Sequence, residues 1–288
     1  MKNLFIILRP KQWIKNLFIF IPLIFGKELF NYSVSLKVLI AFFLFCMMSS
    51  AVYIINDIID IEEDKLHPRK HLRPISSGKV NIKQARLIVA VLIIFSILPS
   101  LYLETCFSWV LVVYFLLNLF YSMILKRIVI IDVFCIAIFF LLRVVAGTVI
   151  SRVEFSYWMI FMIVLLALFL GFHKRRQELE LYEEKARRFV LAKYDSYFID
   201  QMIAVITSSI VVVYMLYTID TRTVTLFGTR NLMYTIPFVY YGIFRYLYLV
   251  HKKKGAEDPT LVLFSDFAMQ LNLLLWVFAC VIVIYFKI

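Results

Sequence analysis

Residues 49–65 read Ser49-Ser50-Ala51-Val52-Tyr53-Ile54-Ile55-Asn56-Asp57-Ile58-Ile59-Asp60-Ile61-Glu62-Glu63-Asp64-Lys65. In this stretch an apolar segment runs directly into Asn56-Asp57-x-x-Asp60-x-x-x-Asp64. On a helix with 3.6 residues per turn, offsets of three and seven residues bring the three aspartates to one face. Carboxylates at the end of a membrane helix repel one another and are costly to desolvate. The stretch therefore predicts an apolar helix that ends in a cation-binding acidic face.

The predicted cation is Mg²⁺. Asp57, Asp60 and Asp64, helped by Asn56, offer only oxygen ligands, and oxygen ligands suit Mg²⁺, which commonly joins protein carboxylates to substrate phosphates. The alternative is a solvated acidic helix end followed by a basic loop. The regular spacing and the basic flank favour the metal site, in which the three aspartates are the predicted catalytic residues.

The composition is that of a membrane protein. Of the 288 residues, 63% are hydrophobic, whereas a soluble domain has roughly 45–50%. Most of the apolar runs approach the ~20 residues that a spanning helix needs. We therefore predict an all-α integral membrane protein with nine transmembrane helices in one catalytic domain, residues 1–288. The runs cover about 14–30, 36–56, 84–101, 105–125, 128–150, 155–172, 198–219, 232–250 and 267–286.

The distribution of charge predicts the orientation. If each run crosses once, most lysines and arginines fall on one side, which the positive-inside rule assigns to the cytoplasm. The N-terminus and the pocket are then cytoplasmic, the C-terminus is outside, and the chain lies in the cell membrane. The net charge of +12 is thus explained by membrane lipids and anionic substrates rather than by nucleic acid. An oligomer is possible, but no oligomeric state can be read from the sequence.

The loop after the acidic stretch is basic. Arg69, Lys70 and Arg73 follow Asp64 within ten residues. Acidic residues that hold Mg²⁺, with cations beside them, suit a diphosphate. The alternative is a loop attracted to anionic lipid, which explains the cations but not the adjacent aspartates.

Two motifs and the helix count carry a resemblance to a known superfamily. The motifs are Asn-Asp-x-x-Asp-x-x-x-Asp at 56–64 and Tyr121-x-x-x-x-Lys126-Arg127, and with nine helices they resemble the UbiA-type intramembrane prenyltransferase superfamily.

Three segments are more specific. They are Arg9-Pro10-Lys11-Gln12-Trp13-Ile14-Lys15-Asn16, Asn56–Asp64 with His67-Pro68 and Arg73-Pro74-Ile75-Ser76-Ser77-Gly78, and Lys174-Arg175-Arg176-Gln177-Glu178-Leu179. Together they resemble one branch, the decaprenyl-phosphate phosphoribosyltransferases. The resemblance implies a UbiA-like bundle with a cytoplasm-facing polar pocket. It also implies transfer of 5-phosphoribosyl from phosphoribosyl diphosphate (PRPP) to a polyprenyl phosphate, with release of diphosphate, for cell-wall or glycolipid precursors.

The second charged loop, about 173–197, departs from the wider family. Typical members carry Asp-x-x-x-Asp there, whereas this chain has Lys174, Arg175 and Glu178. The extra cations fit PRPP together with a lipid phosphate, a more anionic pair of substrates. Glu178 is a possible metal ligand. The alternative is an amphipathic helix from Glu178 to Lys193 that lies on the membrane.

The remaining predicted contacts are scattered along the chain. Asp132 and Arg143 are eleven residues apart, about three helical turns, so both can face one interior cavity. Asp132 is predicted to contact ribose hydroxyls, and Arg143 either joins the pocket or is a structural partner. The other predicted substrate-binding residues are Lys11, Lys15, Asn16, Lys126, Arg127, Arg245 and Tyr246.

Two other functions stay open. A prenyltransferase that moves a prenyl group from its diphosphate to an aromatic ring would use the same Mg²⁺ face, but the missing second aspartate motif counts against it. A non-enzymatic membrane carrier with a cation site is the second alternative. Carriers often have Gly/Pro-broken helices at the membrane midplane, whereas this acidic cluster is predicted at the membrane surface.

Overall fold

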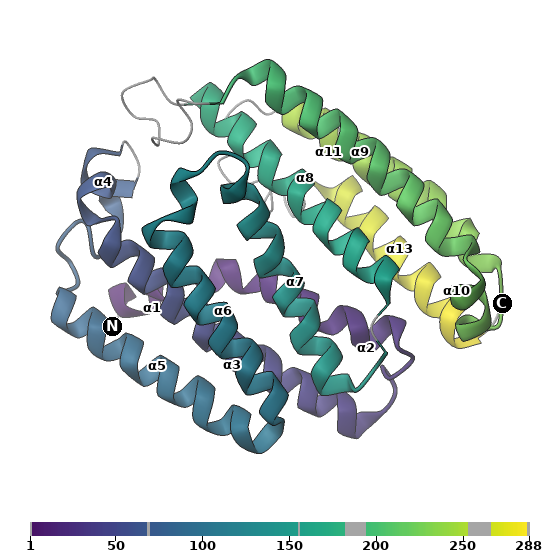
Figure 1. Cartoon of the computed structure of the whole chain (residues 1–288), viewed down its shortest axis with the longest axis horizontal. Helices are drawn as coiled ribbons and strands as arrows, with labels where there is room; N and C mark the ends of the chain where they lie inside the picture. The colour runs from purple at the N-terminus through teal and green to yellow at the C-terminus, as the bar shows by residue number, and fades with distance from the viewer. Residues whose placement is uncertain (1, 68–69, 155, 182–193, 253–265, 287–288) are drawn as a thin grey trace. The chain divides into compact units, whose positions relative to one another are not determined.

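A computed structural model describes residues 2–67, 70–154, 156–181, 194–252 and 266–286. These residues form helices joined by turns and short loops, with no strand among them, and the all-α prediction is confirmed. The chain divides into two compact units, Met1–Phe155 and Ser156–Ile288. The elements of the two units are described separately below (Figure 1).

Seven helices in the described part of the chain are long and apolar enough to cross a membrane, so this is a multi-pass membrane protein. The predicted count of nine is not confirmed. The first apolar run is divided between a 3-10 segment and a five-residue helix with Pro22 in its first turn. The eighth run forms a helix of only 17 residues. The seven helices are α3, α5, α6, α7, α8, α9 and α13.

The first unit is built around α3. This helix packs against α5, α6, α7 and η1. Its core joins Phe45 of α3 to Phe107, Leu111 and Tyr114 of α6. These neighbours hold α3 in one position, and they therefore also fix the position of the acidic stretch at its end. The elements are α1 (Lys2–Ile7), η1 (Pro10–Phe20), α2 (Ile21–Phe25), α3 (Tyr32–Ile59), α4 (Ile61–Leu66), η2 (Lys70–Leu72), α5 (Ile82–Leu103), α6 (Thr105–Met123), η3 (Leu125–Arg127) and α7 (Ile131–Ser151).

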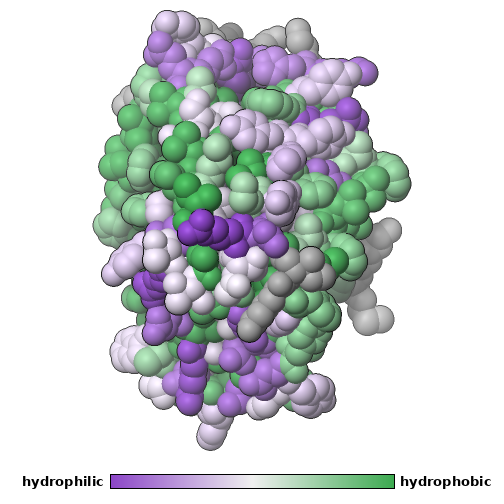
Figure 2. Space-filling view, turned by 90° about the vertical axis from the view of Figure 1, so that its right-hand side faces the viewer, coloured by the Kyte–Doolittle hydropathy of each residue, from purple (hydrophilic) through white to green (hydrophobic). Residues whose placement is uncertain are grey.

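The hairpin between α5 and α6 is as tight as the spacing of the runs predicted. Glu104 alone separates the two helices. The hydroxyl groups of Ser100 and Ser108 hydrogen-bond across the turn at 2.7 Å. The exposed face of α5 carries Leu87 and Phe95, and hydrophobic residues cover much of the surface seen in Figure 2. Such surfaces suit contact with lipid.

A glycine allows α7 to approach η1 closely. A Cβ atom built on Gly147 would collide with the backbone carbonyl of Ile19. Since the obstacle is backbone, a larger residue would push the two elements apart. Gly147 therefore sets the depth at which the N-terminal segment lies against the helices of the first unit.

The second unit pairs α8 with α9 and α11 with α13. Asp195 and Asp220 cap the N-termini of α9 and α10 through their side chains, which satisfies backbone N–H groups that have no partner within the helix. Inside the unit, the hydroxyl of Tyr214 bonds to that of Thr235 at 2.6 Å. The elements are α8 (Tyr157–Leu181), α9 (Ser196–Ile219), α10 (Thr221–Phe227), η6 (Asn231–Thr235), α11 (Ile236–Lys252) and α13 (Phe267–Phe286).

Candidate functional site

The acidic stretch spans a break between two helices. α3 ends at Ile59, and α4 begins at Ile61. Asp60 lies between them with φ −91° and ψ 10°. The prediction of one continuous helix with three aspartates on one face is therefore wrong in part, because the side chain of Asp60 turns to partners of its own.

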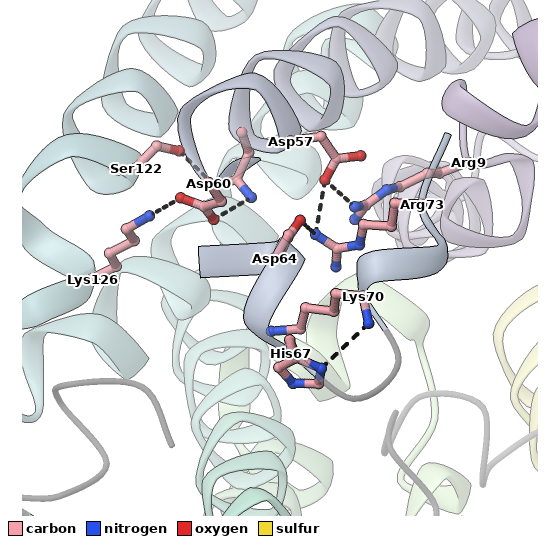
Figure 3. A network of polar contacts seen from close by, with 10 residues as sticks. Arg9, Asp57, Asp60, Asp64, His67, Lys70, Arg73, Ser122 and Lys126 are labelled. Atoms are coloured by element: carbon pink, nitrogen blue, oxygen red, sulfur yellow. Dashed lines mark hydrogen bonds and ion pairs between the residues drawn. The ribbon is translucent and has the colours of Figure 1, made fainter. Parts of the chain in front are cut away.

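Asp57 and Asp64 converge on one guanidinium (Figure 3). Nη1 of Arg73 donates to Oδ1 of Asp57 at 2.9 Å and to Oδ2 of Asp64 at 2.5 Å. Arg9 donates to the same oxygen of Asp57. Both carboxylates are buried, with side-chain exposures of 3% and 4%. The seven-residue spacing thus places this pair on one side, where they share a cation.

Asp60 has a separate set of partners, as Figure 3 shows. Lys126 of η3 forms an ion pair with one carboxylate oxygen. The side-chain amide nitrogen of Asn56 donates to the other oxygen at 3.1 Å, and the hydroxyl of Ser122 on α6 donates to Oδ1 of Asn56 at 3.0 Å. Asn56 and Lys126, both predicted from the sequence, therefore meet the acidic stretch.

The loop that carries Arg73 is anchored by apolar contacts. Ile75 and Val80 are buried in a cluster with Ile54 of α3 and Val89 of α5. Gly78 lies between them at φ 74°, and its N–H donates to the carbonyl of Ile75 at 3.1 Å. A left-handed turn of this kind favours glycine. The two buried side chains hold the loop against α3, and this places Arg73 beside Asp57.

The N-terminal segment is fastened to the same helix. Ser50 donates to the carbonyl of Leu8 at 2.7 Å, and the indole of Trp13 donates to Ser50 at 3.0 Å. Arg9, between them, has φ 51° and ψ 56°, which is an unfavourable conformation for a residue with a side chain. Its guanidinium also lies 5.3 Å from the centre of the Tyr53 ring. Backbone strain of this kind is often found at functional sites. Here the strained residue is Arg9, whose guanidinium contacts Asp57.

The donor set fits Mg²⁺ held together with a diphosphate. In the described residues no three His, Cys, Asp or Glu side chains are grouped closely enough to hold a metal by themselves. Mg²⁺, however, is often bound by one or two carboxylates plus substrate phosphates and water. Asp57 and Asp64, which already share one cation, are such a pair. The buried hydroxyl of Ser76, close to Arg73 in the chain, has no hydrogen-bond partner among the residues that the structure describes.

Asn16 and Arg143 do not fit the substrate contacts predicted for them. Both are buried, and Nε of Arg143 donates to Oδ1 of Asn16 at 2.8 Å. Arg143 also donates to the Phe139 carbonyl at 2.6 Å and the Tyr114 hydroxyl at 3.0 Å. The amide of Asn16 donates to Ser49 at 3.1 Å. Arg143 is thus the structural partner that the sequence left open, and Asn16 joins it to α3.

Other predicted residues of the first unit lie around this site or apart from it. Lys11 and Lys15 lie in η1, a 3-10 segment with three residues per turn, so a spacing of four residues puts them on different faces of it. Arg127 is exposed and lies 3.8 Å from Glu63. Lys70 lies in η2, and its N–H donates to His67 at 3.3 Å. Asp132 is fully buried at the start of α7. Arg69 is outside the described residues.

The predicted residues of the second unit lie on α8 and α11. The predicted loop at Lys174, Arg175 and Glu178 is instead the end of α8, which runs to Leu181 because nothing interrupts the helix after the apolar run. Buried Arg175 donates to Glu178 at 2.7 Å. The amphipathic helix proposed to reach Lys193 extends beyond the described residues.

The two predicted residues of α11 have separate surroundings. Arg245 forms two hydrogen bonds to Asp266, at 3.1 and 2.8 Å. Asp266 in turn accepts from the backbone N–H of Met269 in the first turn of α13. Tyr246 is buried against the rings of Phe169 and His173. Arg245 therefore links α11 to α13, and Tyr246 packs against α8.

Two residues of the site were absent from the prediction. Arg9 belongs to the Arg9-Pro10 segment, but no helical spacing relates it to Asp57, 48 residues away. Ser122 lies in an apolar helix, where a single serine gives no signal of function. Both contacts depend on how the helices pack, which the sequence pattern does not give.

The comparisons with known proteins agree with this architecture. A decaprenyl-phosphate phosphoribosyltransferase of Corynebacterium glutamicum is 32% identical over 286 residues, which cover 96% of this chain and 85% of that protein. The protein of that name from Mycolicibacterium smegmatis is 30% identical and covers 97% of this chain and 91% of its own. The solved structure of a UbiA homolog from Archaeoglobus fulgidus bound to DMAPP and Mg²⁺ has a TM-score of 0.71 at 17% identity, covering 96% and 97% of the two chains.

That structural likeness concerns the fold alone. The family assignment comes from the sequence, because the model of the UbiA prenyltransferase family matches residues 20–274, which is most of the chain. The chain therefore belongs to the UbiA prenyltransferase family.

Proposed function

We propose that this membrane protein transfers a 5-phosphoribosyl group from PRPP to a polyprenyl phosphate and releases diphosphate. The observation that carries the proposal is the pair Asp57 and Asp64 sharing Arg73, with Arg9 beside them. Two buried carboxylates and two guanidinium groups can bind a metal–diphosphate. The relatives named decaprenyl-phosphate phosphoribosyltransferase, which match nearly the whole chain, support this choice of donor and acceptor.

The chemistry requires a stabilised leaving group. The bond between ribosyl C1 and the diphosphate oxygen breaks, and a bond from C1 to the lipid phosphate oxygen forms, with oxocarbenium-like charge on C1 between the two events. Asp57 and Asp64 would hold Mg²⁺, which would supply positive charge for a departing diphosphate. Arg9 and Arg73 can then exchange a carboxylate oxygen for a phosphate oxygen, since guanidinium binds both groups in the same geometry.

The acceptor does not need a strong base. The second pKa of a phosphate monoester is about 6, so its oxygen is already anionic near neutral pH. Within the site, His67 accepts from the N–H of Lys70, so its ring is engaged in the turn. Lys126, which neutralises Asp60, provides a cation at the other edge of the acidic stretch. Its role is to keep that edge attractive to an anionic lipid headgroup.

The whole chain, residues 1–288, is proposed to act as one catalytic domain in the cell membrane. The acidic end of α3 would then face the cytoplasm, where PRPP is available, and the C-terminus would lie outside. Lys174, Arg175 and Glu178 remain proposed substrate contacts. The product would serve as a precursor of cell-wall or glycolipid material.

A direct assay tests the proposal. Purified protein is incubated with Mg²⁺, a polyprenyl phosphate and PRPP, and both diphosphate and lipid product are measured. A phosphoribosyl lipid that requires Mg²⁺ is expected. Omission of the lipid phosphate should abolish diphosphate release, because no acceptor is present.

A parallel mixture separates the alternatives. It contains a prenyl diphosphate with a phenolic acid in place of PRPP and the lipid. Product only in this mixture would contradict the proposal and identify an aromatic prenyltransferase. Turnover in neither mixture by folded protein would favour the carrier, whose binding of Mg²⁺ can be followed by thermal shift.

A further inference from the structure

Two side chains at the end of α3 meet two from the end of α6 and the segment after it. Asn56 and Asp60 are four residues apart, and so are Ser122 and Lys126. The hydroxyl of Ser122 donates to Oδ1 of Asn56 at 3.0 Å, and the side-chain nitrogen of Asn56 donates to Oδ2 of Asp60 at 3.1 Å. Lys126 pairs with the other oxygen of Asp60, as Figure 3 shows. The four side chains therefore form one continuous chain of contacts within the first unit.

The order of donors and acceptors in this chain is fixed. An ionised carboxylate only accepts hydrogen bonds, so the carboxylate of Asp60 must be met by the NH₂ end of the Asn56 carboxamide. The carbonyl end of Asn56 then points to Ser122, and the serine hydroxyl must be the donor of that bond. Ser122 thus holds the carboxamide of Asn56 from the side opposite Asp60.

Lys126 lies outside the helix that carries Ser122. α6 ends at Met123, Ile124 has φ −128° and ψ −58°, and the lysine belongs to the short 3-10 segment η3. Its ammonium group is held instead by the carboxylate of Asp60, and the two side chains are 10% and 12% exposed. The orientation of that carboxylate therefore decides where the ammonium group lies.

The position of this cation matters for the proposed acceptor, whose negative charge is on the lipid phosphate. A lysine binds a phosphate as a point charge, and the strength of that attraction depends on the distance between the two charges. We infer that Ser122 is a positioning residue, acting through Asn56, that keeps Lys126 where it binds the phosphate of the lipid acceptor. This inference rests on the proposed function.

The two substrates can be tested apart. The diphosphate of PRPP is proposed to bind at Asp57 and Asp64, which have a separate set of cations, Arg9 and Arg73. Loss of the Ser122 hydroxyl should therefore weaken binding of the lipid and leave binding of PRPP unchanged. A purely structural serine would not separate the two KM values in this way.

The test compares Ser122→Ala with Ser108→Ala. Both serines lie on α6 and are 4% exposed, and Ser108 bonds to Ser100 at 2.7 Å, so each variant removes one buried hydroxyl that forms a hydrogen bond. Ser122→Ala should raise the KM for the polyprenyl phosphate about two- to tenfold, the factor that corresponds to a net hydrogen-bond contribution of about 0.5–1.5 kcal/mol. The KM for PRPP should keep its wild-type value. Both variants should lower the unfolding temperature by similar amounts, and Ser108→Ala should leave both KM values unchanged.

A second comparison isolates the route through Lys126. In protein that carries Lys126→Met, the addition of Ser122→Ala should cause no further rise in the KM for the lipid, because the group that Ser122 positions is already gone. A further rise would overturn the inference, since Ser122 would then act on the lipid site by another route.

Three other outcomes count against the inference. Equal rises in the KM values for lipid and PRPP in Ser122→Ala would overturn it, because the serine would then support the whole site. KM values equal to those of Ser108→Ala, with normal wild-type turnover, would overturn the inference alone. Absence of any phosphoribosyl lipid from the wild-type protein would overturn the proposed function and the inference together.

Discussion

Two arginines of the first unit occupy opposite surroundings. Arg73 is bonded to two carboxylates, and its side chain is 25% exposed. Arg143 is 3% exposed, and none of its contacts within the described part of the chain is with a carboxylate. Its guanidinium lies 5.1–5.4 Å from the centres of three aromatic rings, those of Phe45, Tyr114 and Phe140.

The difference separates an arginine that can bind a ligand from one that holds the fold together. A guanidinium at a partly exposed edge can exchange a carboxylate for a phosphate with little rearrangement. One enclosed by aromatic rings and neutral oxygens has no route to a ligand, and its bonds instead hold helices together. The sequence predicts Arg73 as a substrate contact because it follows the aspartates closely, whereas Arg143, a charge at membrane depth, is predicted either to join the pocket or to be a structural partner. The identity of the partners, not the charge, distinguishes them.

The largest effect is expected at the shared carboxylates. Asp57→Asn should lower turnover by about 10²–10³-fold, in the range found when one electrostatic contact to a developing charge is removed. It should also weaken the hold on Arg9 and Arg73. Diphosphate release at saturating PRPP measures the first effect, and thermal unfolding in detergent measures the second.

The matched control for that substitution is Glu62→Gln on α4. The side chain of Glu62 is 83% exposed and, within the part of the chain that the structure describes, pairs with Lys65 at 2.8 Å. It should retain full turnover, since exposed pairs contribute little. Equal losses in both variants would mean that general negative charge, not the Asp57–Arg73–Asp64 arrangement, supports the reaction.

Arg143→Met should reduce stability by about 2–4 kcal/mol without changing the KM for PRPP. The substitution leaves Asn16, Tyr114 and the Phe139 carbonyl without a donor in a buried place, and each such loss is costly. Unfolding in denaturant and initial rates give the two readouts. A raised KM with unchanged stability would contradict the structural role and return Arg143 to the substrate site.

Arg73→Gln should raise the apparent affinity for Mg²⁺ in the absence of substrate by several-fold, while turnover falls. Removal of the guanidinium frees Asp57 and Asp64 from a competing cation, and a ligand that binds only the folded protein raises its unfolding temperature. Thermal shift against Mg²⁺ concentration measures this, with Arg127→Gln as the control. Weaker Mg²⁺ binding in Arg73→Gln would show that Arg73 organises the carboxylates instead of competing for them.

The smallest effect is expected at the turn beneath Arg73. Gly78→Ala should cost about 1–2 kcal/mol, because φ 74° is unfavourable for a residue with a Cβ. No atom lies within 4 Å of the added carbon, so the backbone alone is responsible. Thermal unfolding compared with Ser77→Ala, an exposed neighbour, isolates it. Stability equal to that of Ser77→Ala would show that the loop relaxes and that its position is not fixed by this turn.

Much of the architecture could be predicted from sequence, because long apolar runs have few alternatives in a membrane. The α5–α6 hairpin is an example. What failed depended on packing or on local geometry. The 3-10 conformation of η1 cannot be read from α-helical spacing. The side chain of Asp60 pairs with Lys126 and does not share a face with Asp57 and Asp64. Arg9 reaches Asp57 only through the bonds of Ser50 to its flanking residues, which no spacing rule contains.

The bonds along α3 also impose an order of assembly during synthesis. Arg9 can form its hydrogen bond only after Asp57 has been synthesised. Asp60 can pair with Lys126 only after that residue, 66 positions later in the chain, has been synthesised. All of these residues belong to the first unit, Met1–Phe155. A ribosome delivers the chain from its N-terminus, and compact units generally fold as they emerge. The ion pairs at the acidic end of α3 can thus form while the second unit is still being translated. The aspartates are then already paired with cations while the rest of the chain is inserted into the membrane.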